Sequence, residues 1–387
     1  MRRVCFLFNH DALHQIAHSL PVALILATTR GVEVTLAVTT LAAETYIRAI
    51  AGPGLAACQL VQLDLEHTSS RLLSGALNGV VPLRKILLLR DNVGLLGQFD
   101  ALIVPEKTSL VLRKYLNLNP ATALIHTRHG AGDRAIGFDA SSTLFDLTLV
   151  AGPKIARRLE REAGVDPRKL RVVGYPKFDA CAGNRADLAF PQPGLPTVLY
   201  NPHPSPRLSS WFAAGPALLE AFAGSPQHNL IFAPHTMLFK RRWAITIDPP
   251  AVRRTVRPGP AVVAAANLRI DLGSPASIDM SYTNAASLYV GDVSSQVYEF
   301  LLAPRPCLFI DAHRTRWQGN PDYAHWQAGP VITPDDDFLA AADRALNTHE
   351  SYRAVQEDLL RDTFSVTDQP ASVRAAGAIE EFLEGRR

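Results

Sequence analysis

Short apolar runs alternate with segments of helical spacing along most of this 387-residue chain. Seven runs rich in β-branched residues mark the first half: RRVCFLFN, VEVTLAVTT, CQLVQLDL, DALIVPE, TALIHT, FDLTLVAG and LRVVGYP. Between several of them, residues 12–28, 40–50, 69–95 and 154–163 have helical spacing. Continuous apolar strands separated by helices predict a parallel sheet that is covered on both faces.

The same alternation resumes after residues 181–196, a stretch rich in Pro, Gly and Ala that lacks periodicity. TVLYNPH, HNLIFAPH, LRIDLG, ASLYVGD and PCLFID are the later strand candidates, with helices expected at 211–223 and 296–302. A chain of this length is too long for one ordinary core. We therefore expect one domain over 1–182, a second domain over 195–350, and a helical tail over 351–387 that packs back on the first domain.

Composition narrows the function classes only slightly. Hydrophobic residues make up 47% and charged residues 19%, as in a soluble globular protein, and the formal charge is +3. This charge is too small to indicate a nucleic-acid partner, and no basic run with interleaved aromatics supports one. An anionic substrate, such as a nucleotide diphosphate, and an anionic membrane surface remain compatible with it.

No segment has the pattern of a leader or a membrane span. The first apolar stretch breaks after about five residues at Asn9, short of a signal core, and LPVALILA is far below the ~20 residues of a span. The four cysteines are scattered without a CxxC pair, which argues against disulfides. We expect a cytoplasmic protein whose membrane contact, if it has one, is peripheral.

The first candidate for chemistry is a strand-to-helix transition, GDVSSQVYEF, at residues 291–300. Gly291 would end the strand, and Ser294 and Ser295 would open the helix where free N–H groups converge with the positive end of the helix dipole. Asp292 could cap the helix or hold a neighbouring loop. The same residues are favoured as plain helix caps, so an anion site and a cap both stay open at this point.

Three histidines follow predicted strands. His129 lies in LIHTRHGAGD, where Arg128 and Arg134 could hold a phosphate, and it could take a proton from a hydroxyl group. His203 lies in LYNPHPSP and His235 in IFAPHTMLF. Each alone could be an ordinary loop histidine. Together they favour a site, because ligands of parallel sheets bind beyond the carboxyl ends of the strands.

His10, His14 and His18 recur every four residues, which raises the question of a metal site. No HExxH glutamate accompanies them and no carboxylate stands at a suitable helical offset, so we expect no metal. His10 and His14 could instead line an acceptor pocket after the first strand. GxGxxG, Walker-type and GxSxG motifs do not occur, which argues against a dehydrogenase, a P-loop protein and a hydrolase.

In this order, HG, GYPKFD, LYNPH, APH and GDVSSQVYEFLLAPRPCLFID resemble motifs of the CDP-glycerol glycerophosphotransferases, the family of the teichoic-acid primases and polymerases. The resemblance covers residues 124–330 and includes YAHWQAGPVI. It implies an α/β chain with the GT-B fold: two facing Rossmann-like, doubly wound domains with an interdomain cleft. In that family's arrangement, the domain over 1–182 would hold the acceptor and the domain over 195–350 the nucleotide donor.

Residue roles follow from the resemblance position by position. His129 would be the base, His235 would contact the donor phosphate, and Ser294 and Ser295 would bind it on a loop supported by Asp292. Further candidates on the donor side are Gly291, His203, Asp311 and Arg314 or Arg316. Those on the acceptor side are His10, His14, Arg128 and Arg134.

The implied reaction transfers a glycerophosphate-like group from a CDP-linked donor to a hydroxyl of a lipid or glycan acceptor and releases CMP. It requires no cofactor, although a divalent cation could accompany the diphosphate. A nucleotide-sugar glycosyltransferase with Glu299 at the ribose, or a related sugar-nucleotide epimerase, is the first alternative. A non-catalytic nucleotide-binding protein is the second. The sequence does not distinguish among acceptors or fix the oligomeric state.

Overall fold

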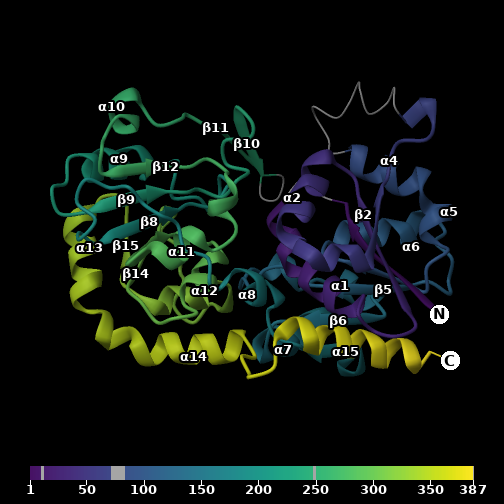
Figure 1. Cartoon of the computed structure of the whole chain (residues 1–387). Coiled ribbons are helices and arrows are strands. Elements are labelled where there is room, and N and C mark those ends of the chain that lie inside the picture. The colour runs from purple at the N-terminus through teal and green to yellow at the C-terminus, as the bar shows by residue number, and fades with distance from the viewer. Residues whose placement is uncertain (10–12, 71–82, 247–249, 387) are drawn as a thin grey trace. The chain divides into compact units, whose positions relative to one another are not determined.

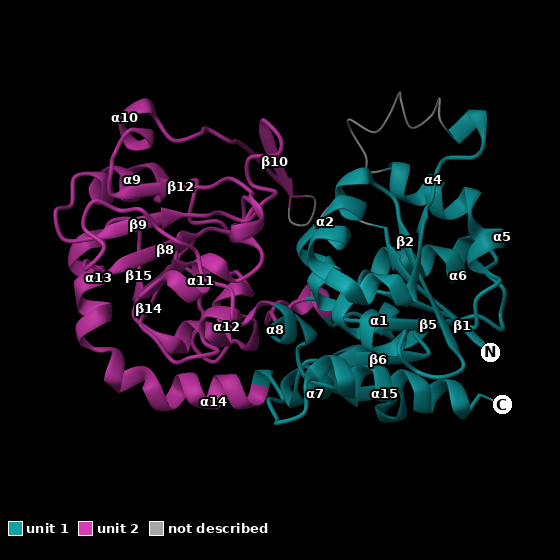
Figure 2. Cartoon of the chain, in the orientation of Figure 1, with its two compact units in different colours: residues 1–129, 138–180, 363–387 teal, residues 130–137, 181–362 magenta. Residues whose placement is uncertain are grey.

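Two groups of residues, each built around its own parallel sheet, make up the computed structural model, which describes residues 1–9, 13–70, 83–246 and 250–386 (Figure 1). Unit 1 comprises 1–129, 138–180 and 363–387, and unit 2 comprises 130–137 and 181–362 (Figure 2). The chain therefore leaves unit 1 after His129, contributes eight residues to unit 2, and returns.

The sheet of unit 1 has the strand order β3-β2-β1-β4-β5-β6-β7, with every neighbouring pair parallel. This is the Rossmann order with one added strand. All seven strands lie within the apolar runs predicted from the sequence, so this prediction is confirmed. Their bounds are β1 Arg2–Phe8, β2 Val32–Val38, β3 Cys58–Gln62, β4 Ala101–Val104, β5 Ala123–Thr127, β6 Leu147–Val150 and β7 Leu170–Val172.

Local signals fix the ends of the unit 1 helices. The Thr40 side chain accepts the N–H of Ala43 at 3.1 Å to cap α2, and α7 has a proline in its first turn and ends at Gly164 with φ +68. The helices are α1 Leu20–Leu26, α2 Leu41–Ala51, α4 Leu83–Asp91, α5 Val93–Leu96, α6 Val111–Tyr115, α7 Pro153–Ala163, α8 Pro176–Cys181 and α15 Ala371–Glu384.

The last helix, α15, belongs to unit 1 and packs on α1. Asp179 accepts the N–H groups of Ala371 and Ser372 at its start, and Arg2 donates to the carbonyl of Leu383 near its end. These hydrogen bonds join the first strand and the last helix of the chain in one unit.

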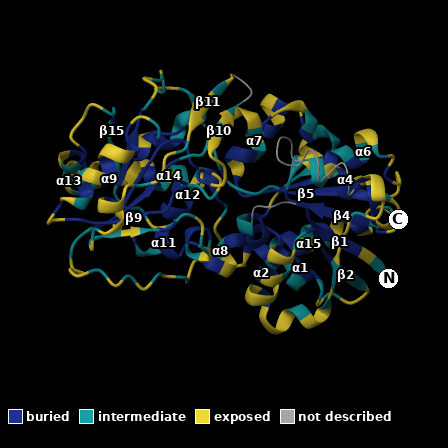
Figure 3. Ribbon diagram, turned by 90° about the horizontal axis from the view of Figure 1, so that it is seen from above, coloured by how far each residue is buried: buried dark blue, intermediate teal, exposed yellow. Residues whose placement is uncertain are grey.

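Unit 2 has the strand order β12-β9-β8-β13-β14-β15, again all parallel, which is the six-stranded Rossmann order. Its interior strands are buried along their length, as Figure 3 shows in dark blue. The strands are β8 Thr197–Asn201, β9 Asn229–Phe232, β12 Leu268–Ile270, β13 Leu288–Gly291, β14 Cys307–Ile310 and β15 Val331–Ile332. The five strands predicted for this half are confirmed, and β15 is an addition.

The helices of unit 2 are α9 Gly215–Ala223, α10 Pro260–Val263, α11 Ser281–Ala285, α12 Gln296–Phe300, α13 Phe338–Asn347 and α14 Arg353–Thr363. α9 and α13 pack on the sheet and share one apolar core with it. The structure also has a separate antiparallel hairpin, β10 Trp243–Thr246 and β11 Ala251–Arg254, which the sequence pattern did not reveal.

Two predicted helices are wrong in extent. Residues 12–28 do not form one helix, because Pro21 stands in the first turn of α1 and a 3₁₀ helix, Leu13–His18, precedes it. The helix expected from residue 211 begins at Gly215, because Pro216 stands in its first turn. Of the expected helix 69–95, residues 71–82 lie outside the described residues. In the described part of the chain, no helix is long and apolar enough to cross a membrane.

Candidate functional site

The turn after β13 is organised by the carboxylate of Asp292, which is 1% exposed. It accepts the N–H groups of His203, Ser210 and Val293 and the hydroxyl of Ser210, at 2.6 to 3.2 Å. Burial raises the pKa of Asp292 to about 6, although these donors act to lower it. Asp292 therefore joins the turn after β13 to the loop after β8 and has a structural role.

Ser294 and Ser295 follow in this turn and differ in exposure. The Ser294 hydroxyl is buried and donates to Asn201 Oδ1 at 2.8 Å, so it faces the interior. Ser295 is exposed. Within the described ranges, the backbone N–H groups of these two serines have no hydrogen-bond partner. Two free N–H groups beside an exposed hydroxyl form a small site for an anion, while α12, with only five residues, adds little dipole.

Two glycines of the segment 130–137 lie against Ser295. A Cβ added at Gly132 would be 3.1 Å from Ser295 Cβ, and one at Gly130 would be 3.5 Å from Ser295 Oγ. Gly130 also has φ +71, a conformation that favours glycine. The HG motif therefore permits a close approach of backbone to the serine turn.

Arg134 of the segment 130–137 and the histidines on the loops after β8 and β9 form a cluster. An N–H of Arg134 lies 3.2 Å from His203 Nε2, and the Ser205 N–H donates to His203 Nδ1 at 3.0 Å. The His203 and His235 ring centres are 6.1 Å apart. Burial, and then Arg134 and His235, hold the pKa of His203 well below its usual range. A neutral ring offers one lone pair to these two donors, so the cluster has more donors than acceptors, as an anion site does.

A buried triad missed by the sequence analysis fixes the same glycine segment to unit 2. Asp133 Oδ2 accepts the hydroxyl of Tyr298 at 2.7 Å, His325 Nδ1 at 2.9 Å and the backbone N–H of His325 at 3.2 Å. His325 Nε2 lies 3.0 Å from the carbonyl oxygen of Asp292. Both ring nitrogens of His325 thus lie within hydrogen-bond distance of an oxygen atom.

The signal for this triad was present in two quoted motifs. Asp133 ends HGAGD and His325 is the histidine of YAHWQAG. Neither motif has a spacing that predicts a pair 192 residues apart in sequence, so the fold was needed to bring them together. Asn201, which accepts from Ser294, was missed for the same reason.

In unit 1, His129 lies beyond the end of β5, and each of its ring nitrogens has a hydrogen-bond partner. Nδ1 is 2.5 Å from the carbonyl oxygen of Pro105, so Nδ1 carries the proton, and Nε2 is 3.4 Å from the Gln15 amide nitrogen. Burial lowers the pKa of His129. The neutral ring therefore has its lone pair on Nε2, as a general base needs.

His14 and His18 gather around His129, with ring centres 6.3 and 6.4 Å from it. His18 also meets the Tyr175 ring edge-on at 4.8 Å. His10 lies outside the described residues. Across the ranges that the structure describes, no group of three or more His, Cys, Asp or Glu side chains is arranged to hold a metal ion.

Arg128 is placed differently from its predicted partner Arg134. Its guanidinium lies 4.4 Å from the centre of the Phe138 ring, which Arg158 also contacts at 4.1 Å. Burial and the nearby Arg158 lower the pKa of Arg128 to about 10. Arg128 thus packs within unit 1, whereas Arg134 belongs to unit 2.

The remaining donor-side candidates are dispersed over unit 2. Asp311 accepts the N–H groups of His313 and Thr315 and shapes the turn after β14. Arg314 is exposed and pairs with Asp335 at 2.7 Å. Arg316 is exposed and Glu299 is buried in α12. A Cβ at Gly291 would lie 2.6 Å from the Tyr289 ring, so Gly291 is needed for packing.

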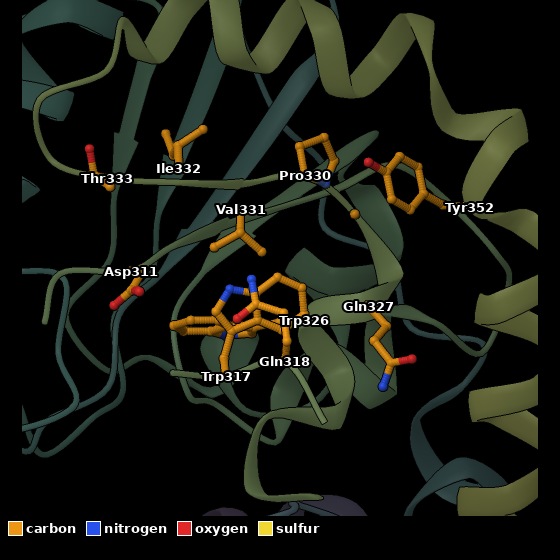
Figure 4. A pocket seen from close by; sticks show the side chains of 11 residues that line it. Asp311, Trp317, Gln318, Trp326, Gln327, Pro330, Val331, Ile332, Thr333 and Tyr352 are labelled. Atoms are coloured by element: carbon orange, nitrogen blue, oxygen red, sulfur yellow. The ribbon is translucent and has the colours of Figure 1, made fainter. Parts of the chain in front are cut away.

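Asp311 also lines an open pocket of about 480 Å³ that runs beside β15 and is lined in addition by Trp317, Trp326 and Tyr352 (Figure 4). Trp326 Nε1 donates to the carbonyl oxygen of Asp292 at 2.8 Å. The pocket wall is therefore hydrogen-bonded to the turn that carries Ser294 and Ser295, and its volume is in the range of small-molecule sites.

No protein-family model matches the sequence, and no curated protein matches it either. Among solved structures, the wall teichoic acid polymerase TagF is similar at 12% identity over 100% of this chain and 89% of that chain, with a TM-score of 0.63. The calicheamicin glycosyltransferase CalG4 is 17% identical over 99% and 98%, with a TM-score of 0.57. A putative UDP-N-acetylglucosamine 2-epimerase from Listeria monocytogenes is 14% identical over 99% and 97%, with a TM-score of 0.60.

Identities this low establish architecture alone. Two Rossmann-like units with parallel sheets, shared with these neighbours over nearly the whole chain, confirm the predicted fold class. The chain has the GT-B fold.

Proposed function

We propose that the protein is a transferase that moves a glycerophosphate-like group from a CDP-linked donor to a hydroxyl of a lipid or glycan acceptor and releases CMP. The observation that carries this proposal is the segment that begins at His129. Its first residue has the tautomer of a general base, and its next residues lie against a serine turn with two free N–H groups.

In the proposed reaction the acceptor oxygen bonds to the β-phosphorus of the donor. The acceptor proton passes to Nε2 of His129, and the bond between the β-phosphorus and the bridging oxygen breaks, so CMP leaves with that oxygen. The N–H groups of Ser294 and Ser295 and the Ser295 hydroxyl would bind the phosphate oxygens. Preorganised donors of this kind stabilise the charge that develops in the transition state.

Arg134, His203 and His235 would hold the second phosphate of the donor. The excess of donors in this cluster supports the assignment, because an anion supplies the missing acceptors. Arg314, which was also predicted at the donor, has no contact with this cluster among the described residues. A histidine-to-asparagine variant of the neighbour TagF was solved after a soak with CDPG, which makes a CDP-linked donor the first to test.

A nucleotide-sugar glycosyltransferase is the second candidate, favoured by the similarity to CalG4 over almost the full length of both chains. The same base and the same anion site would serve it, but the leaving group would be a nucleoside diphosphate. The released nucleotide therefore separates the two candidates.

The test is to incubate the protein with CDP-glycerol or with UDP-linked sugars, in the presence of glycerol-terminated lipid acceptors, and to identify the nucleotide products by chromatography. CMP released from CDP-glycerol by the wild type, and not by His129→Asn, is the expected result. UDP released from a nucleotide sugar would favour the glycosyltransferase. No turnover, together with unchanged nucleotide binding in His129→Asn, would favour a non-catalytic binding protein.

A further inference from the structure

The hairpin of unit 2 carries an unusual concentration of positive charge. Residues 240–246 and 250–257 hold six Lys and Arg side chains and no carboxylate, and the three residues between them add only Asp248. The net charge of the stretch is thus +5, whereas that of the whole chain is +3. The rest of the protein is net negative, so a polyanion would be attracted to this hairpin in particular.

None of these six cations forms an ion pair with a described residue. All six side chains are exposed: Lys240, Arg241, Arg242, Arg253, Arg254 and Arg257. Elsewhere the exposed arginines Arg314, Arg353 and Arg361 each pair with a carboxylate. The absence of such partners leaves the charge of the hairpin available for binding.

The two faces of the hairpin differ. Trp243 pairs with Arg254 and Ile245 pairs with Val252 across the two strands, and paired residues lie on the same face of a sheet. Trp243, Ile245 and Val252 are 50%, 65% and 53% exposed. One face therefore presents three large apolar side chains with an arginine beside them.

The other face of the hairpin holds it to unit 2. Thr246 Oγ1 lies 2.8 Å from Ser205 Oγ, and Arg207 donates to the carbonyl oxygen of Pro250 at 2.8 Å. At the base of the hairpin, Thr255 donates to the carbonyl oxygens of Arg241 and Arg242. These contacts leave the face with Trp243, Ile245 and Val252 exposed.

Exposed apolar side chains beside unpaired cations are the combination that binds an anionic bilayer surface, where tryptophan and aliphatic groups enter the headgroup region and Lys and Arg meet the lipid phosphates. A nucleic acid would match the charge but would leave Ile245 and Val252 without partners. A second copy of the hairpin would match the apolar face but would bring like charges together.

We infer that residues 240–246 and 250–257 form a peripheral docking surface for anionic lipid membranes. Trp243, Ile245 and Val252 insert at the interface, and the six cations bind lipid headgroups. This surface is independent of the proposed reaction, and its test does not require turnover.

The experiment is co-sedimentation of the full chain with vesicles of phosphatidylcholine alone or with 30% phosphatidylglycerol, roughly the anionic share at which basic segments bind. Binding is expected only to the anionic vesicles, and raised salt should weaken it. Each basic residue near such a surface contributes about 5-fold, or about 1 kcal/mol, so Arg241→Glu/Arg242→Glu should bind at least ~30-fold more weakly. Arg30→Glu/Arg161→Glu changes the charge equally at exposed sites of unit 1 and should bind as the wild type does.

Trp243 gives a second readout. The emission that wild type has and Trp243→Phe lacks should shift to shorter wavelength with anionic vesicles and should be quenched by brominated lipids. Trp243→Ser/Ile245→Ser should lose binding without a change in melting temperature, because both side chains are exposed. Equal binding to neutral vesicles, unchanged binding of the charge-reversed variant, binding to RNA but not to vesicles, or a vesicle-independent dimer would each overturn the inference.

Discussion

Asp133 and His325 form a buried pair whose removal has a calculable cost. Their side chains are 0% and 3% exposed, and Asp133 also accepts the Tyr298 hydroxyl and the His325 backbone N–H. Asp133→Asn keeps the size of the side chain but removes the charge that faces three donors. Removing one partner of a buried pair costs about 3–5 kcal/mol, because the groups that faced it stay buried and lose a charged acceptor.

The assay is urea denaturation followed by tryptophan fluorescence. All four tryptophans, Trp211, Trp243, Trp317 and Trp326, lie in unit 2, so their emission reports the unit that holds this pair. At about 2–4 °C per kcal/mol for a domain of this size, the variant should also melt roughly 10 °C lower. Asp133→Asn/His325→Gln should cost clearly less than the sum of the single changes.

Asp335→Asn is the matched control, because Asp335 pairs with Arg314 at the surface of the same unit with both side chains about three-quarters exposed. Such a pair contributes about 0–1 kcal/mol. If Asp133→Asn costs no more than Asp335→Asn, or if the two single changes are additive, Asp133 and His325 are not energetically coupled and the stabilising role given to this pair is refuted.

Three further changes test other parts of the account. His129→Asn should lower kcat/KM by about 10²–10⁴, while the CDP affinity measured by calorimetry should not change. Because burial lowers the pKa of His129, the kcat/KM of the wild type should rise with pH through a pKa below 6.5 and then stay level. A rise centred above pH 7 would contradict this. Burial raises the pKa of Asp292 from 3.8 to about 6, so between about pH 4 and 6 the folded state binds a proton that the unfolded chain does not. The unfolding free energy of the wild type, relative to that of Asp292→Asn, should therefore fall as pH rises through this window. An increase in this difference with pH would contradict the raised pKa. Gly152→Ala should destabilise unit 1 by about 1–3 kcal/mol, because the added Cβ would lie 2.3 Å from the Thr363 carbonyl oxygen. Gly183→Ala is the control and should have little effect, because a Cβ there meets nothing within 4 Å. Thermal melting followed by circular dichroism measures both.

The strands were the most predictable part of the fold. Continuous apolar runs such as those of β1, β5 and β13 have few alternatives in a chain of this composition, because they must be buried on both faces. The β10–β11 hairpin was missed because its four-residue strands are not buried and β11 ends in two arginines, so no long apolar run marks it. Helix starts shifted where a proline stands in the first turn, as at Pro21 and Pro216.

The candidate site was predictable residue by residue but not as a set of contacts. The sequence indicated that Ser294 and Ser295 open a helix, yet it could not indicate that the Ser294 hydroxyl faces Asn201 while Ser295 is exposed. The sequence also predicted that Asp292 supports a neighbouring loop. The three N–H groups and one hydroxyl group that donate to its carboxylate are consistent with that role. Pairs that are distant in sequence, such as Asp133 with His325, are brought together only by the tertiary fold.

Calorimetric titration of the protein with CDP, CMP, UDP and GDP tests the central proposal most directly, with wild type compared to Ser295→Pro and Ser295→Ala. Ser295 has φ −66, which proline adopts, so Ser295→Pro removes the free N–H as well as the hydroxyl. The exposed Ser351→Ala serves as control. A hydrogen bond to a charged group contributes about 1.5–3 kcal/mol. We therefore predict selective CDP binding that weakens at least ~10-fold in Ser295→Pro, less in Ser295→Ala and not in Ser351→Ala. Preference for UDP or GDP, or equal CDP affinity in all four proteins, would contradict a CDP-linked donor held at this turn.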